Sequence, residues 1–516
     1  MEIKDKIYKL IKSFVPEGTN FVVEHPNDLT FGDYSTNAAL VTKNIKDLAD
    51  YCENNRPPEV EKVDYQNGFI NFYLSKEFFK ESLGEIIKKG SEFGKSKHAK
   101  GFKVMVEHTQ PNPFKAFHVG HLMNNTIGES IARVIIANGA GVKTASYHGD
   151  VGMHVAKALW KDDYVLGARA FEEDPSAKAE IQEINKKIYE KSDLEINSRY
   201  EAGKKKSLQE FEKIYNRLGS KFDYNFFESE TAAIGKEIVS KNIGKVFEES
   251  EGAVIFKGEK FGLHTRVFLN SDGLPTYEAK EVGLAKIKKD KYPFDQSITV
   301  TGNEQDAFFN VVEIAVGEVF PELKGKLIHL SHGMLRLPTG KMSSRTGNVI
   351  TAESLIEDVK KKVKGDEAVA IGAIKYMILR QVIGNDIVFD IDKSVSTEGD
   401  SGVYLQYAYA RTNSLLEKAK VSTWQVDTLM TGSTREVERL LYRFPEVVER
   451  AGREYAPHYI TTYLTELAGS FNNFYAHEEI LGDSPESPYR LAIAKAFNIV
   501  MKNGLTILGI PTPERM

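Results

Sequence analysis

The sequence predicts a multidomain protein in which α/β units precede an all-α region. Its 516 residues correspond to about three domains at roughly 150 residues each. A strand, helix, strand pattern covers Val104 to Asp150, which is the repeating unit of a parallel sheet. From about Asp366 to Met516 the strand patterns disappear, whereas helical periodicity continues. We therefore expect a Rossmann-like parallel-sheet domain between a small α/β N-terminal domain and a C-terminal helical bundle.

The composition excludes several classes of protein. The 68 lysines and arginines are balanced by 73 acidic residues, so the net charge of −5 argues against indiscriminate coating of nucleic acid. Cys52 is the only cysteine, which excludes an internal disulfide and a zinc site built on several thiolates, and no zinc is expected. No apolar run approaches the roughly 18 residues of a membrane span, and Met1 to Pro16 lacks a signal-peptide core. We expect a cytoplasmic protein without a membrane segment.

Residues 1–98 are expected to form the small N-terminal α/β domain. Near its start, apolar residues recur at helical spacing and give the first helix one apolar face: Ile3, Ile7, Leu10, Ile11 and Phe14. Between Asn67 and Leu74, after a glycine turn, two sets of residues alternate with a period of two, which predicts a β-strand.

Residues 99–350 are expected to form the Rossmann-like domain. A strand at Val104–Val106 is followed by an amphipathic helix and by a second strand from Val142 to Asp150. Residues from about 160 to 250 include a long stretch rich in lysine and glutamate and are expected to hold a helical insertion. Strand patterns are also present at residues 253–256, 266–270, 297–302 and 326–333. A connecting segment, 351–400, then leads to the helical domain, 401–516.

The most distinctive local pattern is HTQPNPFKAFHVGH, residues 108–121, in the turn between the first strand and its helix. It ends in two histidines, His118 and His121, with Gly120 between them. A helix N-terminus offers free N–H groups and a positive dipole to an anion, so the pair could donate hydrogen bonds to a phosphate. The alternative is a pair of ordinary core or surface histidines. The phosphate-binding loop GxxxxGK[ST] is absent from the sequence, so any nucleotide is held in another way.

A second pattern follows the last predicted strand. In LRLPTGKMSSRTGNVIT, residues 335–351, two glycines bracket Lys341, Ser343 and Arg345. A flexible loop with cations and hydroxyls can close on a triphosphate and neutralise pyrophosphate as it departs. Alone, such a loop is more often a solvated turn; together with the histidine pair, the phosphate interpretation is favoured.

These motifs together resemble a class I aminoacyl-tRNA synthetase, and the flanking sequence resembles arginyl-tRNA synthetases in particular. The resemblance rests on VEHTQPNPFKAFHVGHL, YHGDVG, GVYLQYAYAR, LGIPTPERM and the N-terminal FGDYSTNAAL, and it spans nearly the whole chain. It implies ligation of L-arginine to tRNA(Arg), with ATP converted to AMP and pyrophosphate through an arginyl-adenylate. It also implies Mg²⁺ accompanying ATP, a monomer, an N-terminal domain that contacts the tRNA elbow and a helical anticodon-binding domain.

The resemblance also implies roles for individual residues. The catalytic residues it indicates are His118, His121, Lys341, Ser343 and Lys115. ATP would be bound by His118, Gly120, His121, Met334, Lys341, Met342 and Ser343. Arginine would be bound by Glu107, Asn112, His118, Tyr277, Glu281 and Gln305. Glu281 stands where the family usually has aspartate, so the carboxylate is moved by one methylene and its charge is kept.

For tRNA, the resemblance points to the first predicted helix of the C-terminal region. Tyr404, Gln406, Tyr407 and Arg411 combine aromatic faces with polar groups, which suits stacking on unpaired bases. Tyr404, Tyr407 and Arg411 also lie at helical spacing, so part of this set is expected to be a buried seam.

Three other interpretations stay open. The chain could be a class I synthetase for another amino acid, although a cysteine-specific enzyme would be expected to need thiolate ligands for zinc. A small nucleotidyltransferase can share the His-x-Gly-His pattern, but its chain would be far shorter. A catalytically inactive tRNA-binding paralogue is the non-enzyme alternative, and the presence of His118, His121 and Lys341 argues against it.

Overall fold

The computed structural model describes residues 3–43, 45–336, 338, 350–419 and 434–516. Its N-terminal unit is an antiparallel four-stranded sheet, in the order β1-β2-β4-β3, packed against helices. The predicted apolar face of the first helix is confirmed, because Ile3, Ile7 and Ile11 are buried. The elements of this unit are α1 (Ile3–Lys12), β1 (Val23–Glu24), β2 (Tyr34–Thr36), α2 (Ala38–Thr42), α3 (Ile45–Asn54), β3 (Val60–Gln66), β4 (Phe69–Leu74) and α4 (Lys76–Lys89).

The centre of the molecule is a five-stranded sheet in the order β12-β11-β5-β6-β7, and every pairing in it is parallel. The predicted strand, helix, strand unit is confirmed as β5, α5 and β6. Since the chain crosses from β5 to β6 on one side and returns to β11 on the other, the carboxyl end of β5 lies at the topological switch point, where such sheets bind ligands. The sheet elements are β5 (Lys103–Glu107), α5 (Val119–Ala137), β6 (Gly141–His148), β7 (Tyr224–Phe227), β11 (Gln296–Gly302) and β12 (Leu327–His332).

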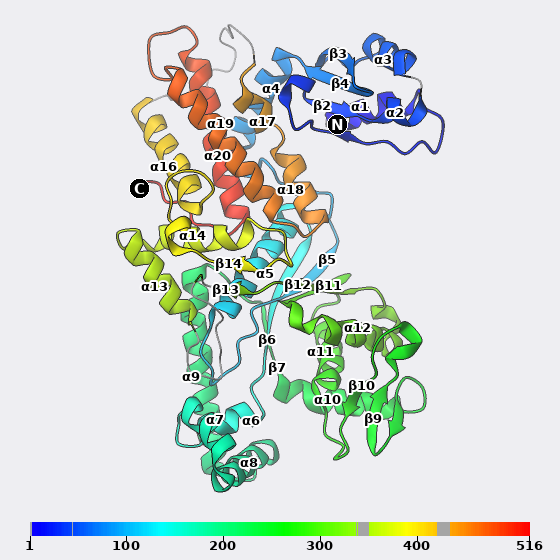
Figure 1. The fold of residues 1–516 in the computed structure, drawn as a ribbon, viewed down its shortest axis with the longest axis vertical. Coiled ribbons are helices and arrows are strands. Elements are labelled where there is room, and N and C mark those ends of the chain that lie inside the picture. Colours follow the sequence, from blue (N-terminus) through cyan, green and yellow to red (C-terminus); the bar gives the residue numbers. More distant parts are fainter. Residues whose placement is uncertain (1–2, 44, 337, 339–349, 420–433) are drawn as a thin grey trace.

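A helical crossover joins β6 to β7 and projects below the sheet in Figure 1. It consists of α6 (Met153–Leu159), α7 (Tyr164–Glu173), α8 (Pro175–Glu190) and α9 (Leu194–Leu218). The expected helical insertion at about 160–250 is therefore wrong in its second half, because that range contains β7, a strand of the main sheet. This strand is four residues long, too short to show a reliable alternation.

A second, antiparallel sheet follows β7 and lies beside the main one. Residues predicted as strands at 253–256 and 266–270 are strands here, but they pair with each other and not with the parallel sheet. The helices around this unit include the one that carries Tyr277 and Glu281. The elements are α10 (Glu228–Lys241), β8 (Glu248–Ser250), β9 (Ala253–Phe256), β10 (Arg266–Leu269), α11 (Tyr277–Lys291) and α12 (Asp306–Val319).

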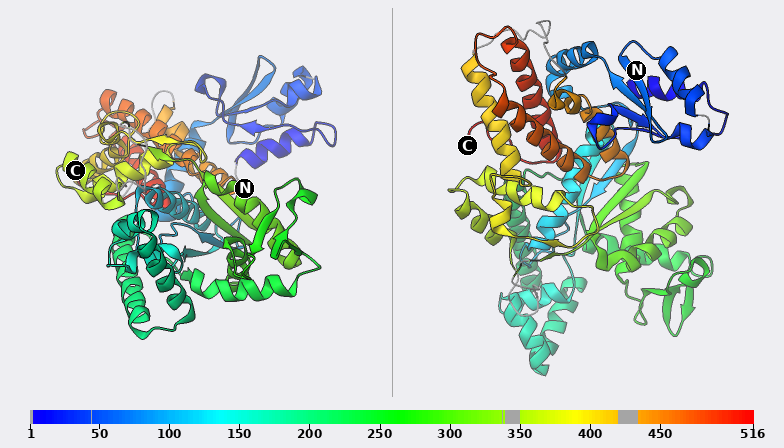
Figure 2. Two further views of the ribbon diagram at one scale, coloured as in Figure 1. Left: turned by 60° about the horizontal axis from the view of Figure 1, so that its bottom comes forward. Right: turned by 45° about the horizontal axis from the view of Figure 1, so that its top comes forward.

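The last third of the chain is a helical bundle stacked above the sheet (Figures 1 and 2). One short strand, β14, lies in the region expected to lack strands, where it pairs in parallel with β13. Two residues are too few to produce a sequence pattern. The elements are β13 (Leu335–Arg336), α13 (Ala352–Lys362), α14 (Glu367–Leu379), β14 (Ile387–Val388), α15 (Ile391–Ser394), α16 (Gly402–Ala419), α17 (Glu436–Leu441), α18 (Phe444–Arg453), α19 (His458–His477) and α20 (Ser487–Ile507).

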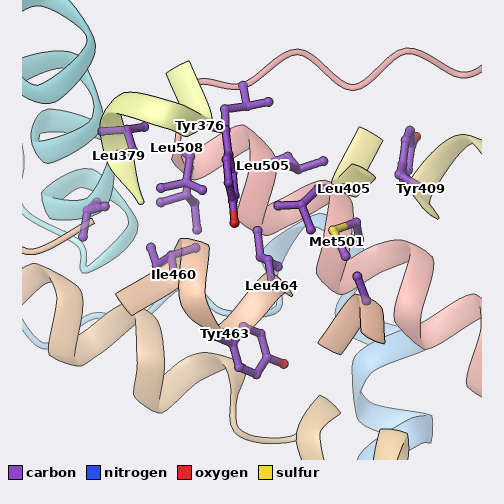
Figure 3. Packing of buried hydrophobic residues seen from close by; sticks show 14 of the residues in the cluster. Tyr376, Leu379, Leu405, Tyr409, Ile460, Tyr463, Leu464, Met501, Leu505 and Leu508 are labelled. Atoms are coloured by element: carbon purple, nitrogen blue, oxygen red, sulfur yellow. The ribbon is translucent and has the colours of Figure 1, made fainter. Parts of the chain in front are cut away.

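One continuous core joins the bundle to the sheet domain through α14, whose residues from Val369 to Leu379 are all buried. Figure 3 shows the packing around it, with Tyr376 and Leu379 of α14 facing side chains of the bundle such as Ile460 and Leu464 of α19. The bundle and the sheet domain therefore share apolar packing and cannot move independently without exposing it. Among the described residues, no helix is both long and apolar enough to span a membrane.

Candidate active site

A cleft of about 900 Å³ opens at the carboxyl ends of β5, β6, β11 and β12. Ten of the residues proposed above line it, although they come from segments more than 200 residues apart in the sequence. These ten are Glu107, Asn112, Lys115, His118, Gly120, His121, Tyr277, Glu281, Gln305 and Met334.

The two histidines form the N-terminal cap of α5. The His118 backbone N–H donates to Nδ1 of His121 (3.2 Å), and the Gly120 N–H donates to Nδ1 of His118 (3.1 Å). The two rings are stacked, with centroids 3.7 Å apart. Because both Nδ1 atoms accept a hydrogen bond, each neutral ring carries its proton on Nε2. Neither Nε2 has a hydrogen-bond partner among the described residues, so both can donate to a ligand.

The charge state of this pair follows from its surroundings. Burial lowers the pKa of His118, and Lys115 lowers it further. Burial also holds the pKa of His121 well below its usual value, with smaller contributions from His118 and Lys115. Both imidazoles are therefore neutral at physiological pH, and Lys115 supplies positive charge beside them.

Gly120 is required by the position of the His118 ring. A Cβ at Gly120 would lie 2.9 Å from two atoms of that ring, closer than side-chain contacts normally allow. The glycine in the His-x-Gly-His pattern therefore lets the first imidazole fold back over the helix N-terminus. Any larger residue would push the ring away from its cap.

The loop between β5 and α5 is strained. Thr109, Gln110 and Phe114 have φ values of 77°, 43° and 66°, in a region that residues other than glycine seldom occupy. The loop is anchored to β6, because Asn112 Oδ1 accepts from the Gly149 N–H (3.0 Å). This contact uses the carbonyl side of the Asn112 amide and leaves its NH₂ group for the cleft, which Asn112 lines.

Four buried or partly buried carboxylates form the inner wall of the cleft, and three of them have a cation. Glu107 is 1% exposed and pairs with Lys288 (2.6 Å). Glu228 pairs with Lys280 (2.6 Å), and Glu278 pairs with Arg266 (3.2 Å).

The fourth carboxylate of this wall, Glu281, makes no ion pair and accepts no hydrogen bond among the described residues, although Lys288, which pairs with Glu107, attracts it and lowers its pKa. Burial raises its pKa to about 8, and the carboxylate of Glu107 raises it too. It is therefore a partly buried acid that would ionise more readily if a cation occupied the cleft.

The remaining candidates lie around the rim. Tyr277, the first residue of α11, is 65% exposed, and the Lys280 ammonium lies 4.9 Å from the centre of its ring. Gln305 ends a short 3-10 helix (Asn303–Gln305) just before α12 and is exposed. Met334 is half-exposed and its backbone is fixed by Asp386 and Ile387.

The cleft also contains residues that sequence reasoning missed, namely Glu228, Arg266 and His154. His154 donates through Nε2 to the Gly149 carbonyl oxygen (2.8 Å), and burial lowers its pKa to about 4. The YHGDVG motif lies directly before His154 and could have drawn attention to it. Glu228 and Arg266 stand in stretches without any distinctive pattern.

Lys341, Met342 and Ser343 lie outside the described residues. The chain on both sides of them is nevertheless placed at the cleft. Leu335 lines it, and the Ile350 carbonyl oxygen accepts from the Val119 N–H, one residue after His118 (3.1 Å).

The proposed tRNA-binding residues on α16 divide into two groups. Tyr407 is 42% exposed, and the Arg411 guanidinium lies 3.9 Å from the centre of the Tyr475 ring. Tyr404 is partly buried and accepts from Asn472 (2.9 Å). Gln406 is fully buried, and its amide donates to the carbonyl oxygens of Ala368 (3.1 Å) and Pro511 (2.8 Å). The expectation that Gln406 contacts tRNA is therefore corrected, because its side chain is used inside the bundle.

Three family models match the chain in sequence. They are described as the arginyl tRNA synthetase N terminal domain (residues 1–74), the catalytic domain of class I (R) tRNA synthetases (residues 82–217 and 160–391) and the DALR anticodon binding domain (residues 405–516). Together they cover all three parts of the fold.

Individual proteins give the same result. The chain is 29% identical to an arginine–tRNA ligase of Streptococcus thermophilus, covering 100% of this chain and 99% of the relative. It is 30% identical to one from Porphyromonas gingivalis, covering 89% of this chain and 88% of the relative. Its fold is similar to the crystal structure of the arginyl-tRNA synthetase of Plasmodium falciparum, with a TM-score of 0.80 at 21% identity over 100% of this chain and 98% of the other.

Proposed function

Because this chain belongs to the arginyl-tRNA synthetase family, we propose that the cleft described above is where it activates arginine. The chain is an arginine–tRNA ligase of class I, and it joins L-arginine to tRNA(Arg). The first step is in-line attack of the arginine carboxylate on the α-phosphate of ATP, which gives arginyl-adenylate and pyrophosphate. The 2′-hydroxyl of the terminal tRNA adenosine then attacks the activated carbonyl.

We assign the histidine pair to the phosphates of ATP. Their Nε2–H groups point away from the cap that holds the Nδ1 atoms, and the pair sits on the positive end of α5. Neutral donors fixed in this way stabilise the negative charge that grows on the phosphates during displacement, without having to reorganise. Lys115 adds a cation on the same side.

Lys341 and Ser343 are assigned to the departing pyrophosphate, and Met334 and Met342 to binding of ATP. The support is the anchoring of the segment that contains them: it leaves the cleft at Leu335 and returns beside His118 at Ile350. The described residues on both sides of this segment therefore lie at the cleft that we assign to the triphosphate.

ATP is generally used with Mg²⁺ in this family. Among the described residues, no group of three or more His, Cys, Asp or Glu side chains is placed to hold a metal ion. The carboxylates of the inner wall lie on the side of the cleft assigned to arginine, and three of them are already neutralised by cations. A magnesium ion would therefore be held by the phosphates of the nucleotide.

Arginine specificity is assigned to the inner wall. A guanidinium is permanently charged and planar, and it pairs best with a carboxylate that has no other cation. Glu281 is the carboxylate that meets this condition, and Tyr277 and Gln305 lie at the open side. The free NH₂ group of Asn112 suits the substrate carboxylate. Glu107 belongs to the same wall, but Lys288 already neutralises it, so we assign it a supporting role in arginine binding.

For tRNA, we propose that Tyr407 and Arg411 present the exposed part of α16 to the anticodon loop, with Tyr404 supporting them from the partly buried side. Stacking on aromatic rings and guanidinium planes is the usual way to hold splayed bases. We also propose that the N-terminal domain contacts the tRNA elbow, and that the protein works as a cytoplasmic monomer.

The observation that carries this proposal is the meeting, in one cleft, of two fixed N–H donors on a helix N-terminus and one partly buried carboxylate, Glu281, that makes no ion pair among the described residues. It is tested by ATP–pyrophosphate exchange with arginine, measured with and without tRNA(Arg). Citrulline, in which a neutral urea replaces the guanidinium, is the matched control. We expect exchange with arginine and none with citrulline. Exchange supported equally by both, or by lysine alone, would refute the assignment of the inner wall, and no exchange at all would favour an inactive paralogue.

A further inference from the structure

Lys375 is a buried lysine, outside the cleft, that joins two helices of different domains. It lies in the middle of α14 and is 1% exposed. Its Nζ donates to the carbonyl oxygen of Leu218, the last residue of α9 (2.6 Å), and to that of Gly509, just after α20 (2.7 Å). Burial lowers its pKa to about 7, and the nearby Arg133 also lowers it.

Arg133 of α5 makes the same connection beside it. Its guanidinium donates to the carbonyl oxygens of Gly219 (2.8 Å) and Thr506 (3.3 Å), and its Nε pairs with Glu129 (2.7 Å). The last carbonyls of a helix have no partner within the helix and carry the negative end of its dipole. The side chains of Lys375 and Arg133 therefore hold the C-terminal ends of α9 and α20 against each other through hydrogen bonds to these carbonyls.

The rest of α9 supports the loop that leads to the histidine pair. Ser207 Oγ accepts from the Phe114 N–H (2.9 Å), and the Phe114 ring lies against Gly203, where a Cβ would come within 2.2 Å of it. Phe211 and Tyr215 pack around Phe117, with ring centroids 6.0 and 6.1 Å away. Phe117 directly precedes His118, so a displacement of α9 would be felt at the first imidazole.

From these contacts we propose that Lys375 is a positioning residue for adenylate formation. It fixes α9 against α20, the last helix of the bundle. Through α9 it holds the loop from Thr109 to His118 in its reactive geometry. A helix is stiff along its axis, so fixing its C-terminal end fixes the side chains farther along it. Figure 1 shows α9 running up from α7 and α8 toward α13 and α14. This inference rests on the proposed function of the cleft.

The test compares Lys375→Met with Asn503→Leu, a matched control on α20. Asn503 also donates to two buried backbone carbonyls, those of Gly90 and Phe93 (both 2.9 Å), but these lie before β5 and away from α9. We expect Lys375→Met to lower the kcat of arginine-dependent ATP–pyrophosphate exchange by about 10- to 100-fold. The KM for arginine and the KM for ATP should stay within about twofold of the wild type. Asn503→Leu should keep its kcat, and Lys375→Arg should recover part of it.

A second readout does not depend on activity. Amide hydrogen exchange of residues 109–118 should be faster in Lys375→Met than in the wild type and unchanged in Asn503→Leu. If the Lys375→Met protein does not fold, Gly509→Ala disturbs the same contact from the other side, because a Cβ there would lie 3.3 Å from the lysine Nζ at a φ of +69°. Equal kcat and equal amide exchange in the Lys375 variant and its control would overturn the inference. If the wild type showed no arginine-dependent ATP–pyrophosphate exchange, the proposed function would be overturned instead. The amide hydrogen exchange measurement would still decide the role of Lys375.

Discussion

At the scale of single residues, Glu281 is the most informative side chain of the site. Three neighbouring carboxylates have ion-pair partners, whereas Glu281 makes no ion pair among the described residues and keeps a raised pKa despite the attraction of Lys288. A substrate guanidinium would complete the charge balance of the wall.

Replacing Glu281 with glutamine should raise the KM for arginine by about 30-fold or more and change kcat little, because a charge pair is lost in both ground and transition states. Steady-state exchange assays measure both constants, and Glu281→Asp should stay near the wild type. An unchanged KM in the glutamine variant would remove Glu281 from the pocket.

The raised pKa of Glu281 also predicts a pH dependence. Arginine binds the ionised carboxylate, so below a pKa of about 8 binding must release a proton. The Kd for arginine should fall about tenfold per pH unit up to pH 8 and level off above it, as measured by calorimetry in buffers of different ionisation enthalpy. Glu281→Gln should lose this slope; a slope that persists in the variant would assign the proton to another group.

The raised pKa of Glu281 also affects the stability of the folded protein. The folded-state pKa of Glu281 lies above the usual value of 4.5, so the charged form is disfavoured in the folded protein. The group therefore costs stability as pH rises from about 4.5 toward 8. Without ligand, Glu281→Gln should melt at the same or a higher temperature than the wild type at pH 8. A clearly lower melting temperature would show that the carboxylate has a stabilising partner.

At the scale of elements, the N-terminal turn of α5 combines a helix cap with the phosphate site that we propose. The Nδ1 atoms of His118 and His121 cap the helix, and this leaves the Nε2–H groups for the ligand. Gly120→Ala should push the His118 ring out of the cap and lower kcat for exchange by about 10- to 100-fold, with arginine affinity unchanged. Equal losses of arginine affinity and kcat would point to a general disruption of the cleft.

Helix α16 carries a buried residue, Gln406, beside the exposed Tyr407, which we propose contacts tRNA. Gln406→Leu should destabilise the protein by about 2 kcal/mol, because two buried carbonyls lose their donor, and should leave the KM for tRNA unchanged. Tyr407→Ala should raise the KM for tRNA and leave the stability of the protein unchanged. Chemical denaturation and aminoacylation kinetics of the two variants measure this contrast, and a raised tRNA KM in Gln406→Leu alone would contradict it.

At the scale of the whole molecule, the order of domains and the β5–α5–β6 unit could be predicted from the sequence, because long periodic segments and a distinctive motif mark them. The short strands β7 and β14 could not, because two to four residues carry no period. The pairing of Glu107 with Lys288 was equally hidden, since only the fold brings β5 and the end of α11 together. Gln406 shares a helix with exposed Tyr407, and the motif did not distinguish the buried side from the exposed one.

The proposed role of Lys341 in pyrophosphate release also leads to a kinetic prediction. The described residues Leu335 and Ile350, on either side of its segment, lie at the cleft, and we propose that Lys341 stabilises the departing pyrophosphate. Lys341→Ala should therefore lower the turnover of adenylate formation far more than it weakens arginine binding. Equal losses in turnover and affinity would argue against a transition-state role.

The central claim is that one cleft holds the triphosphate against the histidine pair and the guanidinium against Glu281. A crystal structure with arginine and a non-hydrolysable ATP analogue tests it most directly. We expect phosphate oxygens within hydrogen-bond distance of Nε2 of His118 and His121, and the guanidinium paired with the Glu281 carboxylate. A nucleotide bound away from the N-terminus of α5, or a guanidinium that leaves Glu281 without a partner, would contradict it.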